Sequence, residues 1–166
     1  IRKSTDVLEN IIQEKVVGYR SPCFSQSTYL EEILLDFGYQ YTSNGIESSL
    51  HDRYAANSVQ QKAIVDFPLP VARLWFIKMP ATGGGWFRLF SVGLQKVLLS
   101  NAAEDVHVFY AHPADFDNKI PMVKIPKLKW LRQTVNSSHS FSKIRKLKFA
   151  EAPLKSFMPE ALEIRR

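Results

Sequence analysis

The apolar positions of the first forty residues change between helical and strand spacing. Four of them share one helical face: Val7, Leu8, Ile11 and Ile12. Ser4 or Thr5 can serve as the N-cap of this helix. Residues 15–20 then take strand character up to Pro22, because proline disfavours a helical conformation in the residue before it.

A second helical stripe follows and is the clearest in the chain: Leu30, Ile33, Leu34 and Phe37. Thr28 with Glu31 predicts a capping box at its start, and Gly38 predicts its end. Residues 39–42 alternate as a strand does. The order helix–strand–helix–strand favours a parallel α/β sheet.

The remaining elements are more irregular. We predict a strand over residues 63–67, a glycine-containing loop over 80–85 and a helix over about 90–99. Residues 106–111 are short, β-branched and aromatic, which predicts a buried strand. One further amphipathic helix is predicted from apolar and aliphatic positions at helical spacing: Phe141, Ile144, Leu147 and Lys148.

Composition sets limits on the class of protein. The 166 residues suffice for one ordinary domain with a core, and the 45% hydrophobic content argues against disorder. No run of about 18 apolar residues exists, so the sequence predicts no transmembrane segment. The single cysteine, Cys23, excludes an intramolecular disulfide and an all-cysteine zinc site. Cytoplasmic and membrane-associated locations both remain open.

The net charge of +6 is unevenly distributed along the chain. Residues 119–150 contain nine Lys or Arg and no Asp or Glu. We interpret this segment as a solvated basic surface. A nucleic-acid-binding module, in which Trp130 and Phe141 interleave with the cations, is the less favoured alternative.

Three short strings carry candidate chemistry. Residues 18–25 (Gly-Tyr-Arg-Ser-Pro-Cys-Phe-Ser) close a predicted strand, where Arg20 can bind a carboxylate or simply brace a turn. Residues 82–88 are rich in glycine but lack the Lys-Ser/Thr of a phosphate loop, and their aromatic pair can stack on a sugar or pack in a core. His112 ends a predicted strand, where it is either a proton donor or a structural residue.

In this order and spacing the strings resemble those of the polysaccharide deacetylases (carbohydrate esterase family four). More specifically, they resemble those of the exopolysaccharide-associated subgroup, which has a C-terminal extension. The matching strings are Gly18 to Ser25, His51-Asp52-Arg53-Tyr54, Phe67-Pro68-Leu69, Gly83 to Arg88, and Phe109-Tyr110-Ala111-His112-Pro113. The resemblance implies an α/β fold, with residues 1–115 as the C-terminal half of a deformed (β/α) barrel. Residues 116–166 would be a basic extension packed on it.

The resemblance also implies an activity, namely metal-dependent hydrolysis of N-acetyl groups from amino sugars of a bacterial polysaccharide. His112 corresponds to the general acid and Arg20 to the arginine that orients the base aspartate, while the backbone N–H near Cys23 would help to hold the oxyanion. The residues expected along the substrate groove are Cys23, Phe24, His51, Asp52, Gly84, Trp86 and Arg88.

The departure from the family is the metal site. The family's paired aspartates and its two histidines three residues apart precede the region matched here, so no metal ligand is assigned to this chain. We expect a divalent metal, zinc, held by residues not present in it, and a missing N-terminal half or a complementary chain as partner. The start, without an initiator Met, fits a fragment, which we expect to be unstable alone. A non-catalytic carbohydrate-binding or scaffolding protein is the alternative.

Overall fold

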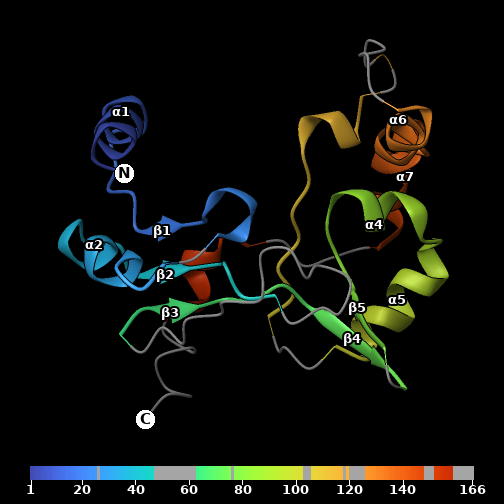
Figure 1. Cartoon of the computed structure of the whole chain (residues 1–166), viewed down its shortest axis with the longest axis horizontal. Helices are drawn as coiled ribbons and strands as arrows, with labels where there is room; N and C mark the ends of the chain where they lie inside the picture. The colour runs from blue at the N-terminus through green and yellow to red at the C-terminus, as the bar shows by residue number, and fades with distance from the viewer. Residues whose placement is uncertain are drawn as a thin grey trace. The chain divides into compact units, whose positions relative to one another are not determined.

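The computed structural model describes most of the chain, in these ranges: 1–25, 27–46, 63–75, 77–102, 106–117, 119, 126–147 and 152–158. Its described residues fall into two compact units (Figure 1). Unit 1 contains residues 1–46, 63–68 and 152–158, and unit 2 contains the described residues between 69 and 147. Residue 115 lies within unit 2. This division into compact units does not test the expected boundary between barrel and extension, which stays a prediction.

Unit 1 is built on a small parallel sheet. Strands β1 (Gly18–Tyr19), β2 (Tyr41–Thr42) and β3 (Val65–Asp66) pair in parallel in the order β1-β2-β3. Helix α1 (Arg2–Ile12) precedes β1, and helix α2 (Leu30–Asp36) connects β1 to β2 (Figure 1). The predicted parallel pairing is confirmed for these strands, whereas their membership of a larger barrel stays a prediction.

The predicted end of α2 is confirmed and its predicted start is wrong. Gly38 adopts φ 76°, the left-handed conformation that ends a helix at low steric cost. No side chain caps the N-terminus of α2, so Thr28 forms no capping box. The carboxylate of Glu31 instead accepts the N–H groups of Ala63 at 2.6 Å and Ile64 at 3.0 Å. A tertiary contact with the entry to β3 has replaced the local one.

The core of unit 1 forms between α2 and the sheet. Its buried members are Leu30, Leu34, Tyr39 and Ile64, with Val16, Tyr19 and Phe37 packed against them. Helix α1 joins this core through a 2.8 Å hydrogen bond between the hydroxyls of Thr5 and Tyr39. Its predicted apolar face is exposed in the described structure, with Ile11 at 72% and Val7 at 56%.

Unit 2 begins with an antiparallel hairpin that the sequence pattern did not predict. Strand β4 (Val71–Leu74) pairs with β5 (Ile77–Pro80), and helices α4 (Gly84–Leu89) and α5 (Val92–Ser100) follow (Figure 1). The helix predicted over 90–99 is confirmed as α5. Helix α4 starts inside the predicted loop 80–85, so that part of the loop prediction is wrong.

The strand predicted over residues 106–111 is also wrong. The segment joins no ladder among the described residues, and individual hydrogen bonds hold it instead. The hydroxyl of Thr82 donates to the Val108 carbonyl at 2.7 Å, and the Gly84 N–H donates to the Tyr110 carbonyl at 3.3 Å. These bonds place the segment at the N-terminal end of α4.

The chain of unit 2 ends in short helices. After the 3₁₀ turn η2 (Pro113–Asp115) come α6 (Lys127–Thr134), η3 (Ser137–His139) and α7 (Ser140–Leu147). The last of these confirms the predicted final helix. A further 3₁₀ turn, η4 (Leu154–Phe157), belongs to unit 1.

The core of unit 2 lies between the hairpin and α5. Its buried cluster consists of Ala72, Ala81, Leu98 and Leu99, with Met79 and Phe90 packed against it. Across the described ranges, every helix is too short or too polar to cross a membrane.

Candidate functional site

Arg20 lies at the carboxyl end of β1 and reaches across to the end of β2. Its Nε donates to the Ser43 carbonyl at 3.0 Å, and its Nη2 donates to the Ser43 hydroxyl at 2.6 Å. The Ser43 hydroxyl in turn donates to the Phe67 carbonyl beyond β3, at 2.6 Å. The guanidinium also lies 5.7 Å from the centre of the Phe24 ring. One side chain therefore braces the ends of all three parallel strands.

Asp66, at the end of β3, organises the turn that follows β2. Its carboxylate accepts the Thr42 hydroxyl at 2.6 Å and the N–H groups of Asn44 and Gly45, each at 2.9 Å. The Asn44 amide oxygen accepts the Ser21 N–H at 2.8 Å. Ser43, Asn44 and Asp66 were missed by the sequence analysis. The sequence offered two separate signals, the Asn44-Gly45 turn and an aspartate near the end of a predicted strand, but not their contact.

The turn after β1 has unusual backbone geometry. Cys23 and Phe24 are consecutive non-glycine residues with φ 53° and 57°. Such conformations cost roughly 1–3 kcal/mol each and gather at functional sites. The Phe24 N–H donates to the Ser21 carbonyl, whereas the Cys23 N–H has no acceptor within the described ranges. The Cys23 thiol is exposed and free.

In unit 2, the glycine string allows the 106–112 segment to approach α4 closely. Gly83, the N-cap of α4, has φ 97°, and a side chain on it would overlap the ring of Tyr110. At Gly84 a Cβ would lie 3.3 Å from the carboxylate of Asp115. These two glycines therefore allow a close approach of protein segments, which requires no bound ligand.

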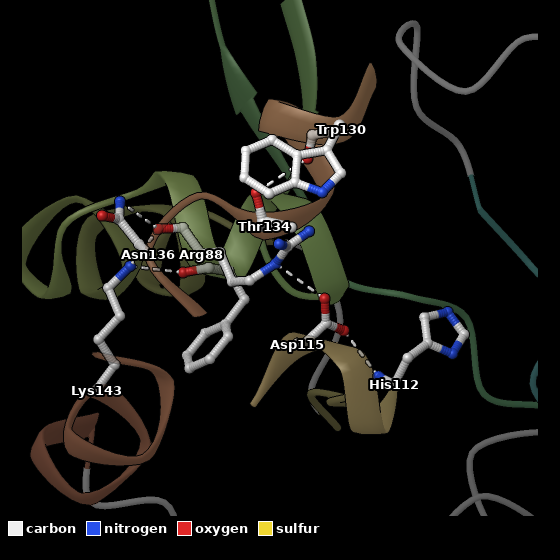
Figure 2. A network of polar contacts seen from close by, with 8 residues as sticks. Arg88, His112, Asp115, Trp130, Thr134, Asn136 and Lys143 are labelled. Atoms are coloured by element: carbon white, nitrogen blue, oxygen red, sulfur yellow. Dashed lines mark hydrogen bonds and ion pairs between the residues drawn. The ribbon is translucent and has the colours of Figure 1, made fainter. Parts of the chain in front are cut away.

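Arg88 lies one helical turn after Gly84, and its side chain is paired with Asp115 (Figure 2). The guanidinium Nε lies 2.9 Å from Asp115 Oδ1, and both residues are only 4% exposed. The second carboxylate oxygen, Oδ2, accepts the backbone N–H of His112 at 2.7 Å. His112 therefore satisfies Oδ2 of this carboxylate, whereas Arg88 Nε, although 2.9 Å from Oδ1, lacks hydrogen-bond geometry toward it.

His112 itself is exposed and extended, with φ −98° and ψ 154°, and it is the N-cap of η2. Its imidazole points away from the Arg88–Asp115 pair (Figure 2). The ring of Tyr110 lies beside it, at 6.0 Å between ring centroids and nearly perpendicular. The backbone of His112 is thus held by the buried pair while its ring faces outward.

The C-terminal end of α4 is fixed by two polar side chains. Lys143 Nζ donates to the carbonyls of Phe87 and Arg88, each at 2.8 Å, and Asn136 Nδ2 donates to the Arg88 carbonyl at 3.1 Å (Figure 2). Partial burial lowers the pKa of the Lys143 ammonium below its usual value. This member of the 119–150 basic segment therefore supports the fold, contrary to the interpretation of that segment as a solvated surface.

The predicted site residues are distributed over both units. Arg20, Cys23 and Phe24 belong to unit 1, whereas Gly84, Trp86, Arg88 and His112 belong to unit 2. Trp86 is half-buried and stacks on Phe90, with 5.6 Å between ring centroids. His51 and Asp52 lie outside the described residues.

Two expectations bear on chemistry. Contact between Arg88 and a substrate stays a prediction, and the structure gives its guanidinium a buried carboxylate partner. Within the described ranges, His, Cys, Asp and Glu side chains form no group of three that could hold a metal ion. The described residues therefore do not fit a metal site.

Asp115 is the residue of this polar network that the sequence analysis did not single out. A signal for it was present, because His112-Pro113-Ala114-Asp115 has proline at the first position of a helical turn and an acid at the third.

Residues 39–154 match the protein family described as "Domain of unknown function (DUF3473)". That family is known as a C-terminal region associated with polysaccharide deacetylases. Searches of curated proteins and of solved structures gave no match. The matched range begins in the core of unit 1 and includes the whole His112–Arg88 region of unit 2.

Proposed function

The chain belongs to the DUF3473 family, and from this premise we propose that it is the C-terminal part of a polysaccharide deacetylase. The reaction is hydrolysis: water adds to the N-acetyl carbonyl of an amino sugar, the C–N bond breaks, and acetate and a free amine are released. The substrate would be a bacterial polysaccharide. Such a reaction needs a proton donor for the leaving nitrogen and a means of stabilising the oxyanion.

The observation that carries the proposal is the placement of His112. Its imidazole is exposed, while the main chain below it is bonded to a buried ion pair. Histidine is the side chain whose proton affinity best suits proton transfer near neutral pH. An imidazole that faces outward from a fixed main chain suits a general acid that protonates the amine as it leaves.

Two features of unit 1 support the proposal. Arg20 is braced at the ends of parallel strands, where sites are commonly built in α/β folds, and would orient a base carboxylate supplied from outside this chain. The strained turn at Cys23 leaves one backbone N–H without an acceptor in the described ranges. That N–H would donate to the oxyanion.

The expected divalent metal, zinc, would supply an activated water when bound. Since the described residues hold no suitable ligand group, we assign it no ligand here and derive no step through it.

The test is acetate release from an N-acetylated glycan by the complete protein with added divalent metal. We expect His112→Ala to lower kcat by roughly 10² to 10⁴, the usual contribution of a general acid. His139→Ala is the matched control, because His139 is exposed in η3 and its ring contacts Ser138 rather than the His112 region. Near-normal turnover in His112→Ala would refute the assignment. Glycan binding without any acetate release would instead support a non-catalytic scaffold.

A further inference from the structure

We propose that Asp115 and Arg88 are positioning residues for His112: the buried pair clamps the main chain of His112 and so fixes where its imidazole can reach. The proposal rests on the role of His112 in the proposed function. It assigns a task to a carboxylate that the sequence motifs did not single out.

The clamp acts on both backbone groups of one residue. The His112 N–H donates to Asp115 Oδ2 at 2.7 Å, and the His112 carbonyl accepts the Asp115 N–H at 2.8 Å. Pro113 between them restricts His112 to the extended conformation that it adopts. With its main chain closed into this ring, His112 retains only its two side-chain torsions.

The clamp is itself anchored to α4. Asp115 Oδ1 meets the guanidinium of Arg88 at 2.9 Å in a site from which solvent is nearly excluded. A carboxylate in such a site cannot move away from its cation without a large desolvation cost. Asn136 and Lys143 hold the carbonyl of the same Arg88 residue (Figure 2). The position of His112 is therefore fixed by contacts with α4 and with the residues that hold α4, and not only by its own loop.

The geometry separates two tasks of Asp115. Its negative charge satisfies Arg88, whereas its second oxygen accepts the main-chain N–H of His112. The first task is one of stability and the second is one of position. Because a displacement of about 1 Å in a reacting group can cost up to 10²-fold in rate, the second task should be visible in kcat.

Two substitutions separate these tasks. Asp115→Ala removes both the charge and the acceptor, whereas Asp115→Asn removes the charge but retains an oxygen for the His112 N–H. In the complete protein we expect Asp115→Ala to lower kcat by roughly 10- to 100-fold with KM nearly unchanged. Asp115→Asn should recover most of this loss although both variants unfold at similarly reduced temperatures. Equal kcat in the two variants, per folded molecule, would overturn the proposal.

A second readout does not depend on activity. Hydrogen exchange of the His112 amide should be slow in the wild type and in Asp115→Asn, and fast in Asp115→Ala. Asp117→Asn is the matched control, since Asp117 is exposed and, among the described residues, accepts the Lys119 N–H rather than that of His112. If the exchange pattern holds but the wild type releases no acetate, the proposed function fails and the clamp stands. If His112 protection is independent of Asp115, the clamp fails whatever the activity.

Discussion

The two units use an arginine and an aspartate in opposite ways. In unit 1, Arg20 and Asp66 do not pair with each other: Arg20 binds the carbonyl and hydroxyl of Ser43, and Asp66 accepts from neutral donors within residues 42–45. In unit 2, Arg88 and Asp115 pair directly and are almost fully buried. The half-buried carboxylate of Asp66 accepts from neutral donors, whereas the almost fully buried carboxylate of Asp115 is paired with a cation.

A second contrast is between one glycine of each unit, Gly38 and Gly83. Gly38 in unit 1 ends a helix in open space, with no atom within 4 Å of the position that a Cβ would take. Gly83 in unit 2 has positive φ and also faces the ring of Tyr110. Gly38 therefore follows a short-range conformational rule, whereas Gly83 is also required by a contact with a segment distant in sequence. We expect matched substitutions in the two units to reveal this difference, from the largest effect to the smallest.

Removing one buried partner in unit 2 should have the largest effect. Arg88→Met leaves the carboxylate of Asp115 buried without its cation, which should cost about 3–5 kcal/mol of unfolding free energy. Arg20→Met, the matched change in unit 1, should cost only about 1–2 kcal/mol, because the site is half-buried and the two bonds to Ser43 are made to neutral groups. Urea denaturation of both variants measures the difference. Equal losses would remove the distinction, and Arg88→Met combined with Asp115→Leu should recover part of the stability.

The glycine pair should show the next largest difference. Gly83→Ala should cost roughly 3 kcal/mol, because a residue other than glycine is strained at this φ and its Cβ would meet the Tyr110 ring. Gly38→Ala should cost about 1–2 kcal/mol, from the left-handed backbone alone. Thermal unfolding of the two variants compares them. A larger loss at Gly38 would contradict the assignment of tertiary crowding to Gly83.

Asp66→Asn should have a smaller effect than Arg88→Met, about 1–2 kcal/mol. The introduced amide can accept fewer of the three donors, so at least one of them loses its partner. Amide exchange at Asn44 and Gly45 should accelerate in this variant. Asp36→Asn, an exposed change on α2, serves as the control and should leave both exchange rates unchanged.

Lys143 should give the smallest effect, seen in the pH dependence of stability. Burial lowers its pKa in the folded state, so in the range just below pH 10.5 the unfolded chain binds more protons than the folded one. The contribution of Lys143 to stability should therefore rise as pH rises through that range and fall as pH is lowered. The measurement is the stability difference between wild type and Lys143→Met at neutral and alkaline pH. A difference that shrinks toward high pH would contradict the burial of this amine.

Much of unit 1 was predictable because its elements follow short-range patterns. The stripe of Leu30 and Leu34, the stop at Gly38 and the alternation at residues 39–42 predicted α2 and β2. The start of α2 was not predictable in this way. Glu31 can either complete a capping box with Thr28 or accept the N–H groups of Ala63 and Ile64. The second arrangement, which the structure shows, depends on β3 lying beside the helix.

In unit 2 the sequence identified several candidate residues but not the contacts that they make. The glycine string and His112 were both recognised as candidates, and Arg88 was interpreted as a substrate contact. Residue composition also led to the wrong strand over 106–111, since β propensity cannot show whether a partner strand exists. The structure instead supplies individual hydrogen bonds from Thr82 and Gly84.

The sequence by itself determined that this chain has helices and parallel strands at set places, an arginine at one strand end and a histidine beside a proline. Only the tertiary structure decided that Asp115 joins Arg88 to the main chain of His112. The reason is physical: a periodic pattern records which residues share a face of one element. An ion pair between residues 27 positions apart depends on how two elements pack, and no local pattern encodes that.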